Sequence, residues 1–368
     1  MKNSILSKMF VYAALSFFAA SCGSSRNIEE KRDLDYYIAN AIELKGEPLQ
    51  TEYITSSPSF NCYYTPMGFF GTMKNENENE KIVHLADLQT GEVKASALAK
   101  GRGPDEILIT NPSTDIFNGE LYLLDMMSEK IMKAGISDGD ITIENVMKLN
   151  SKQPMFFVNM QAINDSLFVI FASNTEPRRS ILLIDKNNNI LDSLAYYPYE
   201  DEKINQTSMN FNVEMRLSPD KKHLFISCNQ YDCISKYEIQ ENKIVPIKKM
   251  FFIEPKYTIK DGRPVRPENY VYFNSSIRAG EKYIYVTIDP ESIKEYRERQ
   301  KKADGSGARK WAQPCNDNYI LVFDYDLKLV QSYLTQSNIF DFTLTPDPSV
   351  LYASDSRESR LVKYKLPL

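Results

Sequence analysis

The stretch Leu121-Tyr122-Leu123-Leu124-Asp125, with the turn Asp138-Gly139 after it, shows the pattern that repeats along this chain. A short apolar run of this kind is typical of a strand that is covered on both faces. Asp-Gly accepts the positive φ angles of a two-residue hairpin, so strands are predicted on both sides of that turn. The unit is therefore an apolar strand, a polar connection, a second strand, a tight turn and a third strand.

Further copies of this unit occupy the rest of the chain. The apolar strand, taken as the first of each unit, recurs as Leu167-Phe168-Val169-Ile170-Phe171, Leu224-Phe225-Ile226-Ser227, Tyr283-Ile284-Tyr285-Val286 and Leu351-Tyr352-Ala353-Ser354-Asp355. The tight turn recurs as Thr90-Gly91, Asn188-Asn189, Glu241-Asn242 and Tyr325-Asp326. Gly91, Gly139, Asn188 and Asn242 are separated by 48, 49 and 54 residues. A period of about 50 residues with several strands per unit predicts the blades of a β-propeller.

The next step, from Asn242 to Asp326, is 84 residues, which indicates an insertion in blade 5 at about 290–314. Asp289 is a suitable N-cap, Pro290 a suitable first residue, and 291–303 a run of strong helix formers that ends before Gly305. We therefore expect one helix in this insertion.

The last unit, 360–368, ends where its tight turn should come, so its outermost strand has to come from elsewhere. We expect 36–44 to supply it and to join the first and last blades. One unit before Gly101, four with the turns from Gly139 to Asp326, and one at the C-terminus make six. The predicted fold is an all-β, six-bladed β-propeller over residues 34–368, closed by an N-terminal strand, with one helical insertion in blade 5.

Residues 1–21 resemble the signal peptide of a bacterial lipoprotein. Lys2 and Lys8 precede and flank an apolar run that reaches Ala20, and Ser21-Cys22 follows. The run is too short to cross about 30 Å of hydrocarbon. Ala19 stands where the lipobox has a branched aliphatic residue, and an ordinary secretory signal is the alternative. The resemblance implies a lipid on Cys22 and a short polar tether over 22–33.

The same resemblance implies an address in the cell envelope. Gly23 follows the cysteine, whereas many inner-membrane lipoproteins carry aspartate there. We therefore expect an outer-membrane lipoprotein that is attached to the membrane through Cys22. Residues 1–33 do not distinguish the periplasmic face of that membrane from the cell surface.

Two stretches resemble a known family. Leu351-Tyr-Ala-Ser-Asp355 followed by Arg360-Leu-Val-Lys-Tyr364 is similar to the strand pair of NHL-repeat and TolB-like propellers. Gly101-Arg-Gly-Pro-Asp-Glu-Ile107 resembles the Gly-x-Gly-Pro-x-Glu turn of TolB-like six-bladed propeller lipoproteins. The resemblance covers nearly the whole mature chain. It implies an architecture and a lipoprotein signal, and no single chemistry.

Charge and cysteine content limit the function. The chain has 44 basic and 49 acidic residues, and loss of Lys2 and Lys8 with the signal leaves 42 basic residues. This excess of negative charge argues against a nucleic-acid partner. Cys228 and Cys233 flank a four-residue loop and are candidates for a disulfide across a hairpin. With only two histidines, His84 and His223, we expect no metal site and no cofactor.

The turn at 101–107 is the first candidate ligand site. Successive N–H groups of Gly101 and Gly103 can form a nest for an anion, with Arg102, Asp105 and Glu106 near the rim of the central channel. The turn lacks the rest of a P-loop or dinucleotide motif, so a purely structural turn is the alternative.

A second candidate surface is the loop 257–270 between blades 4 and 5. Its arginines and tyrosines suit the recognition of carboxylates or sugar rings, and the candidates are Arg263, Arg266 and Tyr270, with Arg278 downstream. A solvated connector is the alternative. Trp311 in the insertion is either a ligand anchor or a packing residue.

Catalytic motifs are poorly represented. The two histidines fall in separate units and no Gly-x-Ser-x-Gly elbow occurs. The sequence therefore favours a binding module for a protein or glycan partner over an enzyme. The alternative is a propeller enzyme that acts on carbohydrate or peptide with acid/base carboxylates at the channel.

Overall fold

A computed structural model describes the chain in segments. They are residues 34–49, 60–73, 81–87, 89–103, 105–108, 113–150, 155–174, 180–199, 201–204, 213–228, 233–267, 271–273, 276–288, 290–292, 318–337, 339–355 and 360–367. The chain divides into two compact units, Met1–Ala39 and Asn40–Leu368. The first contains helix α2 (Leu34–Ala39). No helix in the described part of the chain has the length and apolar character needed to cross a bilayer.

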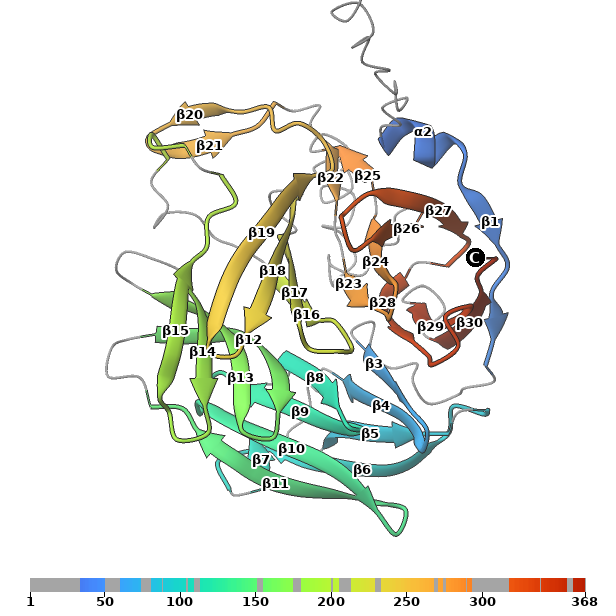
Figure 1. Ribbon diagram of the computed structural model, residues 1–368. Helices are drawn as coiled ribbons and strands as arrows, with labels where there is room; N and C mark the ends of the chain where they lie inside the picture. The colour runs from blue at the N-terminus through green and yellow to red at the C-terminus, as the bar shows by residue number, and fades with distance from the viewer. Residues whose placement is uncertain are drawn as a thin grey trace, which may run out of the picture. The chain divides into compact units, whose positions relative to one another are not determined.

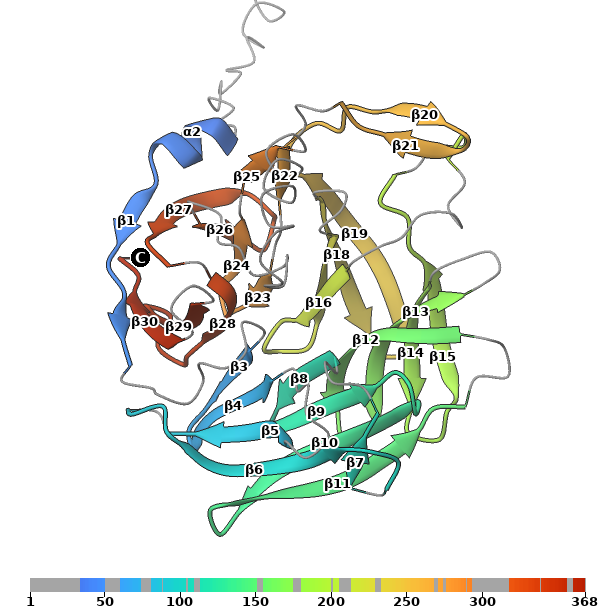
Figure 2. The same cartoon turned by 180° about the vertical axis from the view of Figure 1, so that it is seen from behind.

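The second unit is a ring of six blades, in each of which four strands pair antiparallel (Figures 1 and 2). Blade 1 contains β3 (Phe60–Thr65), β4 (Gly68–Met73), β5 (Lys81–Ala86), β6 (Val93–Lys100) and β7 (Glu106–Ile107). Blade 2 contains β8 (Ser113–Phe117), β9 (Glu120–Asp125), β10 (Lys130–Ser137) and β11 (Asp140–Lys148). Blade 3 contains β12 (Met155–Asn164), β13 (Leu167–Asn174), β14 (Ser180–Asp185) and β15 (Ile190–Ala195).

The other three blades complete the ring. Blade 4 contains β16 (Val213–Leu217), β17 (His223–Cys228), β18 (Cys233–Gln240) and β19 (Lys243–Phe251). Blade 5 contains β23 (Ile277–Ala279), β24 (Tyr283–Ile288), β26 (Asn318–Asp324), β27 (Leu329–Thr335) and β1 (Ile42–Leu44). Blade 6 contains β28 (Ile339–Leu344), β29 (Val350–Asp355), β30 (Arg360–Lys365) and β2 (Glu47–Pro48).

Two small two-stranded sheets accompany the blades. They pair β20 (Thr258–Lys260) with β21 (Arg263–Val265), and β22 (Val271–Phe273) with β25 (Pro290–Ser292). The innermost strands of the ring are β3, β8, β12, β16, β23 and β28 (Figure 1).

The repeating turns lie where the sequence predicts them, between the third and fourth strands of blades 1 to 5. Positive φ angles occur at Gly91 (72°), Asp138 (52°), Gly139 (87°) and Asn188 (66°), as such hairpins require. The apolar strands, however, are the second of each blade and not the first. The strands that precede them, nearest the centre, carry more polar residues and gave a weaker hydrophobic signal.

The second strands are apolar because both of their faces are covered by neighbouring blades. One cluster of buried side chains lies between blades 3 and 4 and includes Val169, Met215 and Ile226. Similar clusters join blades 1 to 2, 2 to 3, 5 to 6 and 6 to 1. The core is therefore a set of layers between blades, and the polar centre is separate from it.

An N-terminal strand closes the last blade, as predicted, but it is not the predicted segment. Glu47–Pro48 pairs with β30, and Leu49 N–H donates to Leu361 O at 2.9 Å. The predicted segment 36–44 instead contains the end of α2, at Ala39, and strand Ile42–Leu44, which pairs in parallel with β27 of blade 5. The segment after Ala39 thus contributes one strand to each of the last two blades.

The expected helix in the blade 5 insertion does not begin at Pro290. Pro290–Ser292 is strand β25, paired antiparallel with Val271–Phe273. Proline is compatible with the first position of a strand as well as with that of a helix. Its presence at position 290 therefore did not distinguish a strand from a helix. The remainder of the predicted helix, 293–303, lies outside the described residues.

Candidate ligand-binding site at the centre of the ring

Polar side chains occur at alternate positions on the innermost strands of blades 2 to 6 or, for Ser276, directly before the strand. The pairs are Ser113 and Asp115, Asn159 and Gln161, Glu214 and Arg216, Ser276 and Arg278, and Asp341 and Thr343. Residues i and i+2 of a strand share a face, so both members of each pair lie on the same side.

Many of these side chains bind the main chain of the next blade. Asp115 accepts from Ala162 N–H at 2.9 Å, and Gln161 Oε1 accepts from Leu217 N–H at 3.1 Å. Thr343 Oγ1 accepts from Tyr64 N–H at 2.9 Å, which joins the last blade to the first. The innermost strand of each blade is a sheet edge, and its N–H groups need acceptors when they are buried. The central polar residues supply them.

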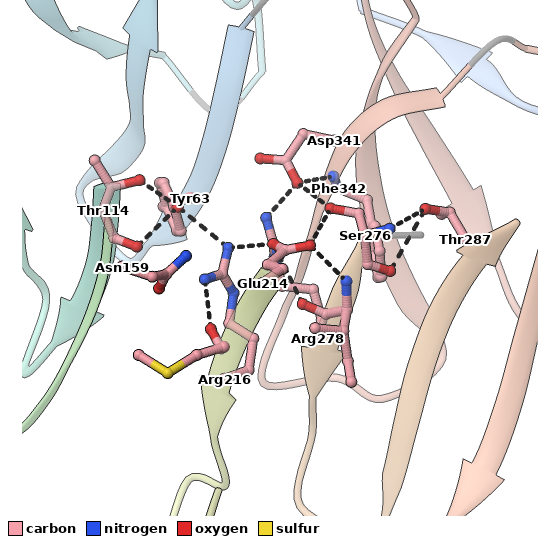
Figure 3. Close-up of polar contacts among 12 residues, drawn as sticks. Tyr63, Thr114, Asn159, Glu214, Arg216, Ser276, Arg278, Thr287, Asp341 and Phe342 are labelled. Atoms are coloured by element: carbon pink, nitrogen blue, oxygen red, sulfur yellow. Dashed lines mark hydrogen bonds and ion pairs between the residues drawn. The ribbon is translucent and has the colours of Figure 1, made fainter. Parts of the chain in front are cut away.

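Four charged side chains form the arginine–carboxylate cluster: Glu214, Arg216, Arg278 and Asp341 (Figure 3). Arg216 Nη2 and Arg278 Nη1 both donate to Glu214 Oε1, at 2.6 and 2.5 Å. Arg278 Nη2 donates to Asp341 Oδ1. All four side chains are at least four-fifths buried. Blades 4, 5 and 6 are therefore joined by ion pairs in an environment with little water.

The two carboxylates have further donors. Glu214 Oε2 accepts from Ile277 N–H at 2.9 Å and lies 3.0 Å from Ser276 Oγ. Asp341 accepts from Phe342 N–H at 2.8 Å and from Cys62 N–H at 3.3 Å. These bonds offset the loss of hydration that burial of a charge requires.

The pKa values of the two acids shift in opposite directions. Burial alone would raise the pKa of Glu214, but Arg216 and Arg278 together with the hydrogen bonds outweigh it and hold this pKa below its ordinary value. Burial raises the pKa of Asp341, and the charge of Glu214 adds to that effect, so that Arg278 does not fully compensate. Glu214 is accordingly the stronger acid of the pair.

Tyr63 of blade 1 lies beside both arginines. The Cζ atoms of Arg278 and Arg216 lie 5.6 and 6.0 Å from the centre of its ring, within the range of cation–π attraction. Its hydroxyl contacts Thr114 of blade 2 (Figure 3). The ring thus connects the charged cluster to the opposite side of the centre.

A cavity of about 320 Å³ lies next to this cluster, at the C-terminal ends of the innermost strands. We call it the channel cavity. Residues from all six blades line it, among them Tyr64, Phe117, Gln161, Lys221, Ala279 and Thr343. Arg216 and Arg278 also line it, whereas Glu214 and Asp341 are not among the lining residues. The arginines therefore separate the two carboxylates of the cluster from the cavity.

Of the sequence-predicted site residues, Arg278 lies in this central site, with a side chain that is about nine-tenths buried. The turn at 101–107 does not. Because β7 pairs in parallel with β6, the turn lies at the outer edge of blade 1, and Arg102, Asp105 and Glu106 are not at the channel rim.

The glycine nest in that turn is occupied by the protein's own carboxylate. Gly103 N–H donates to Glu106 Oε2 at 2.6 Å, and Gly101 N–H donates to Ile107 O at 3.0 Å. This arrangement is the structural turn that the sequence left as the alternative.

We expect Gly101→Ala to lower the free energy of unfolding by about 1 kcal/mol, the value of one hydrogen bond. An added Cβ would lie 2.0 Å from Glu106 Oε2, so the carboxylate would have to leave Gly103 N–H. Chemical denaturation measures the effect, and the same substitution in a Glu106→Ala background is the control. An equal loss in both backgrounds would contradict this account.

Arg263 and Arg266 lie on or next to a separate hairpin formed by β20 and β21 (Figure 1). Arg266 Nη2 donates to Tyr199 OH at 3.0 Å, and Tyr199 stacks on Tyr257 with ring centres 4.7 Å apart. The structure therefore does not bring Arg263 and Arg266 together with Arg278. Tyr270 and Trp311 lie outside the described residues, as do Cys22 and Cys315.

Cys228 and Cys233 face each other in register across β17 and β18. Both are buried and carry thiols in this structure. The disulfide remains a prediction. Within the described residues, no group of three or more His, Cys, Asp or Glu side chains is arranged to hold a metal ion.

Sequence reasoning missed Tyr63, Glu214, Arg216, Lys221 and Asp341. For Glu214, Arg216 and Asp341 the signal that was present is the pair of polar residues two positions apart, just before the apolar second strand of blades 2 to 6; Tyr63 and Lys221 lie outside this pattern. Such a pair recurs five times along the chain, and that recurrence distinguishes it from an ordinary solvated loop.

The comparisons with known proteins agree with this architecture. A family model described as "TolB-like 6-blade propeller-like" matches residues 73–347. A member of the DUF4221 family from Bacteroides vulgatus is 13% identical, with a TM-score of 0.55 over 89% of this chain and 98% of that one. An exported protein of Bacteroides fragilis, described as putative, is 11% identical, with a TM-score of 0.55 over 90% and 97%. These two structures share the fold. No curated protein sequence matches the chain.

Proposed function

Since the chain belongs to the TolB-like six-bladed propeller family, we propose that it is a lipid-anchored, exported propeller that binds a protein or glycan partner. The observation that carries the proposal is the channel cavity, which is walled by residues of all six blades. Its volume of about 320 Å³ is at the lower end of the range for small-molecule sites. It accommodates one sugar residue or one side chain of a larger partner.

Binding is a better account of this site than acid–base catalysis. A general acid or base must come within about 3 Å of the proton that it transfers. Glu214 and Asp341 lie behind the arginines and use their oxygens for main-chain N–H groups and ion pairs. Asp115 lines the cavity, but it accepts from Ala162 N–H and has no second carboxylate beside it among the described lining residues.

The purified full chain in detergent micelles, screened against a glycan array and a peptide library, tests this function. We expect binding of a glycan or a peptide without turnover. Hydrolysis of a bound compound would favour the enzyme alternative. No binding to either class would contradict the proposal.

Attachment to the outer membrane rests on the sequence of residues 1–23. Two or three acyl chains on Cys22 would hold the protein firmly, because each buried methylene contributes about 0.8 kcal/mol. We expect Cys22→Ser to abolish labelling by radioactive palmitate and to remove the protein from the outer-membrane fraction. Cys315→Ser is the matched control and should be labelled normally. Unchanged labelling of the Cys22 variant would contradict the lipoprotein assignment.

A further inference from the structure

We propose that the channel cavity binds a uronic acid, that is, a pyranose ring that carries one carboxylate. This inference rests on the proposed binding function and names the ligand class for the same site. Three features of the cavity support it: the sign of the charge on its wall, the size of that charge, and the side chains available for a ring.

The wall of the cavity presents cations. Lys221, Arg216 and Arg278 line it, and Asp115 is the only acidic residue among the described lining residues. Lys221 Nζ is 4.0 Å from Asp115 Oδ2, a loose ion pair, and lies 5.2 Å from the ring centre of Phe117. Its side chain is about one-fifth exposed. An anion in the cavity would contact Lys221, Arg216 and Arg278, whereas Glu214 and Asp341 do not line the cavity.

The positive charge is small, which favours a monoanion. Arg216 and Arg278 are already paired with Glu214, and Arg278 is also paired with Asp341. Lys221 has only a loose ion pair with Asp115, at 4.0 Å, so it is the least compensated of the three described cations on the wall. A carboxylate matches it, whereas a phosphate dianion would leave charge unpaired in a site that is mostly removed from water.

The remaining wall suits a ring with an apolar face and hydroxyl groups. Tyr63, Tyr64 and Phe117 provide aromatic surface. Asn118 provides an amide at the same cavity, and the Thr343 hydroxyl, which accepts from Tyr64 N–H at 2.9 Å, has a second lone pair. Tyr64 is held in place by a stack on Tyr352, with an interplanar angle of 5°. Concave sites with mostly apolar walls and a few placed polar groups are typical of small-ligand binding.

Calorimetric titration of the full chain in micelles with D-glucuronate tests the inference. We expect binding at least about tenfold tighter than that of D-glucose, which lacks the carboxylate, and of N-acetylglycine, which lacks the ring. Lys221→Met keeps the length of the side chain and removes its charge, and should weaken glucuronate about tenfold. Lys222→Met is the matched control, because Lys222 is the exposed neighbour and does not line the cavity.

Equal affinity for glucuronate and glucose would overturn the role of charge, and equal affinity for N-acetylglycine would overturn the role of the ring. Unchanged binding by Lys221→Met would place the ligand elsewhere and overturn the assignment of the site. If glucuronate does not bind but a neutral glycan or a peptide does, this inference fails and the proposed function stands. If none of them binds, both fail.

Discussion

Replacement of Glu214 by glutamine is expected to lower the free energy of unfolding by about 3–5 kcal/mol. The substitution removes the negative charge that two buried arginines share, at 2.5 and 2.6 Å, and leaves Arg216 without its carboxylate partner. The new amide nitrogen cannot accept a hydrogen bond, and it faces either the two arginines or the pair Ile277 N–H and Ser276 Oγ, depending on the orientation of the amide. Denaturant titration at neutral pH measures the loss, and Glu92→Gln, on an exposed side chain, is the control that should change little.

The contributions of Glu214 and Asp341 to the free energy of unfolding should change with pH in opposite directions. The pKa of Glu214 is depressed below its ordinary 4.5, so its contribution to stability is present above about pH 4.5 and is lost as pH falls through the folded value. The pKa of Asp341 is raised above 3.8, so its contribution is complete below that pH and is lost as pH rises through the folded value.

It follows that Asp341→Asn should cost less at neutral pH than Glu214→Gln, because burial disfavours the charged form of Asp341 whereas the two arginines stabilise the charged form of Glu214. It should also remove part of the loss of stability that accompanies rising pH, while Glu214→Gln should flatten the acid limb. Equal costs for the two substitutions at neutral pH would contradict the opposite directions of the two pKa shifts.

The second large effect concerns the segment that joins the last two blades. Leu44 is 4% exposed and packs with Tyr333 and other side chains of blades 5 and 6. We expect Leu44→Ala to lower the free energy of unfolding by about 2–5 kcal/mol, as is usual for a buried leucine. Ile42 lies two residues earlier in the same strand but is 41% exposed, so Ile42→Ala should cost less than about 1 kcal/mol.

Thermal and denaturant unfolding of both variants measure this difference. Similar effects of Leu44→Ala and Ile42→Ala would mean that β1 does not hold blades 5 and 6 together. Near-wild-type stability of Leu44→Ala would contradict the account of closure.

Local signals were enough to predict the repeat. Asp138-Gly139 and Asn188-Asn189 form their turns through their own backbone preferences, and the spacing of such turns counts the blades. The predicted closing strand was wrong in its residues because pairing partners are chosen by tertiary contacts. Nothing local distinguishes Ile42–Leu44, which pairs with β27, from Glu47–Pro48, which pairs with β30.

The central site could be predicted only in part. Arg278 was predicted as a candidate because it follows an arginine-rich loop in the sequence. Its partners Glu214 and Asp341 are more than 60 residues away along the chain. Such contacts depend on the ring geometry and leave no local pattern. Glu106 shows the reverse case: a local Gly-x-Gly motif suggested a ligand site, but the carboxylate three residues after Gly103 fills it.

A crystal structure of the protein grown with D-glucuronate shows whether the cations on the wall of the channel cavity bind a ligand. We expect one sugar in the cavity, with its carboxylate next to Lys221 and its ring against Tyr64 or Phe117. An empty cavity, with glucuronate bound instead at Arg263 and Arg266 on and next to the β20–β21 hairpin, would show that the cavity is not the binding site.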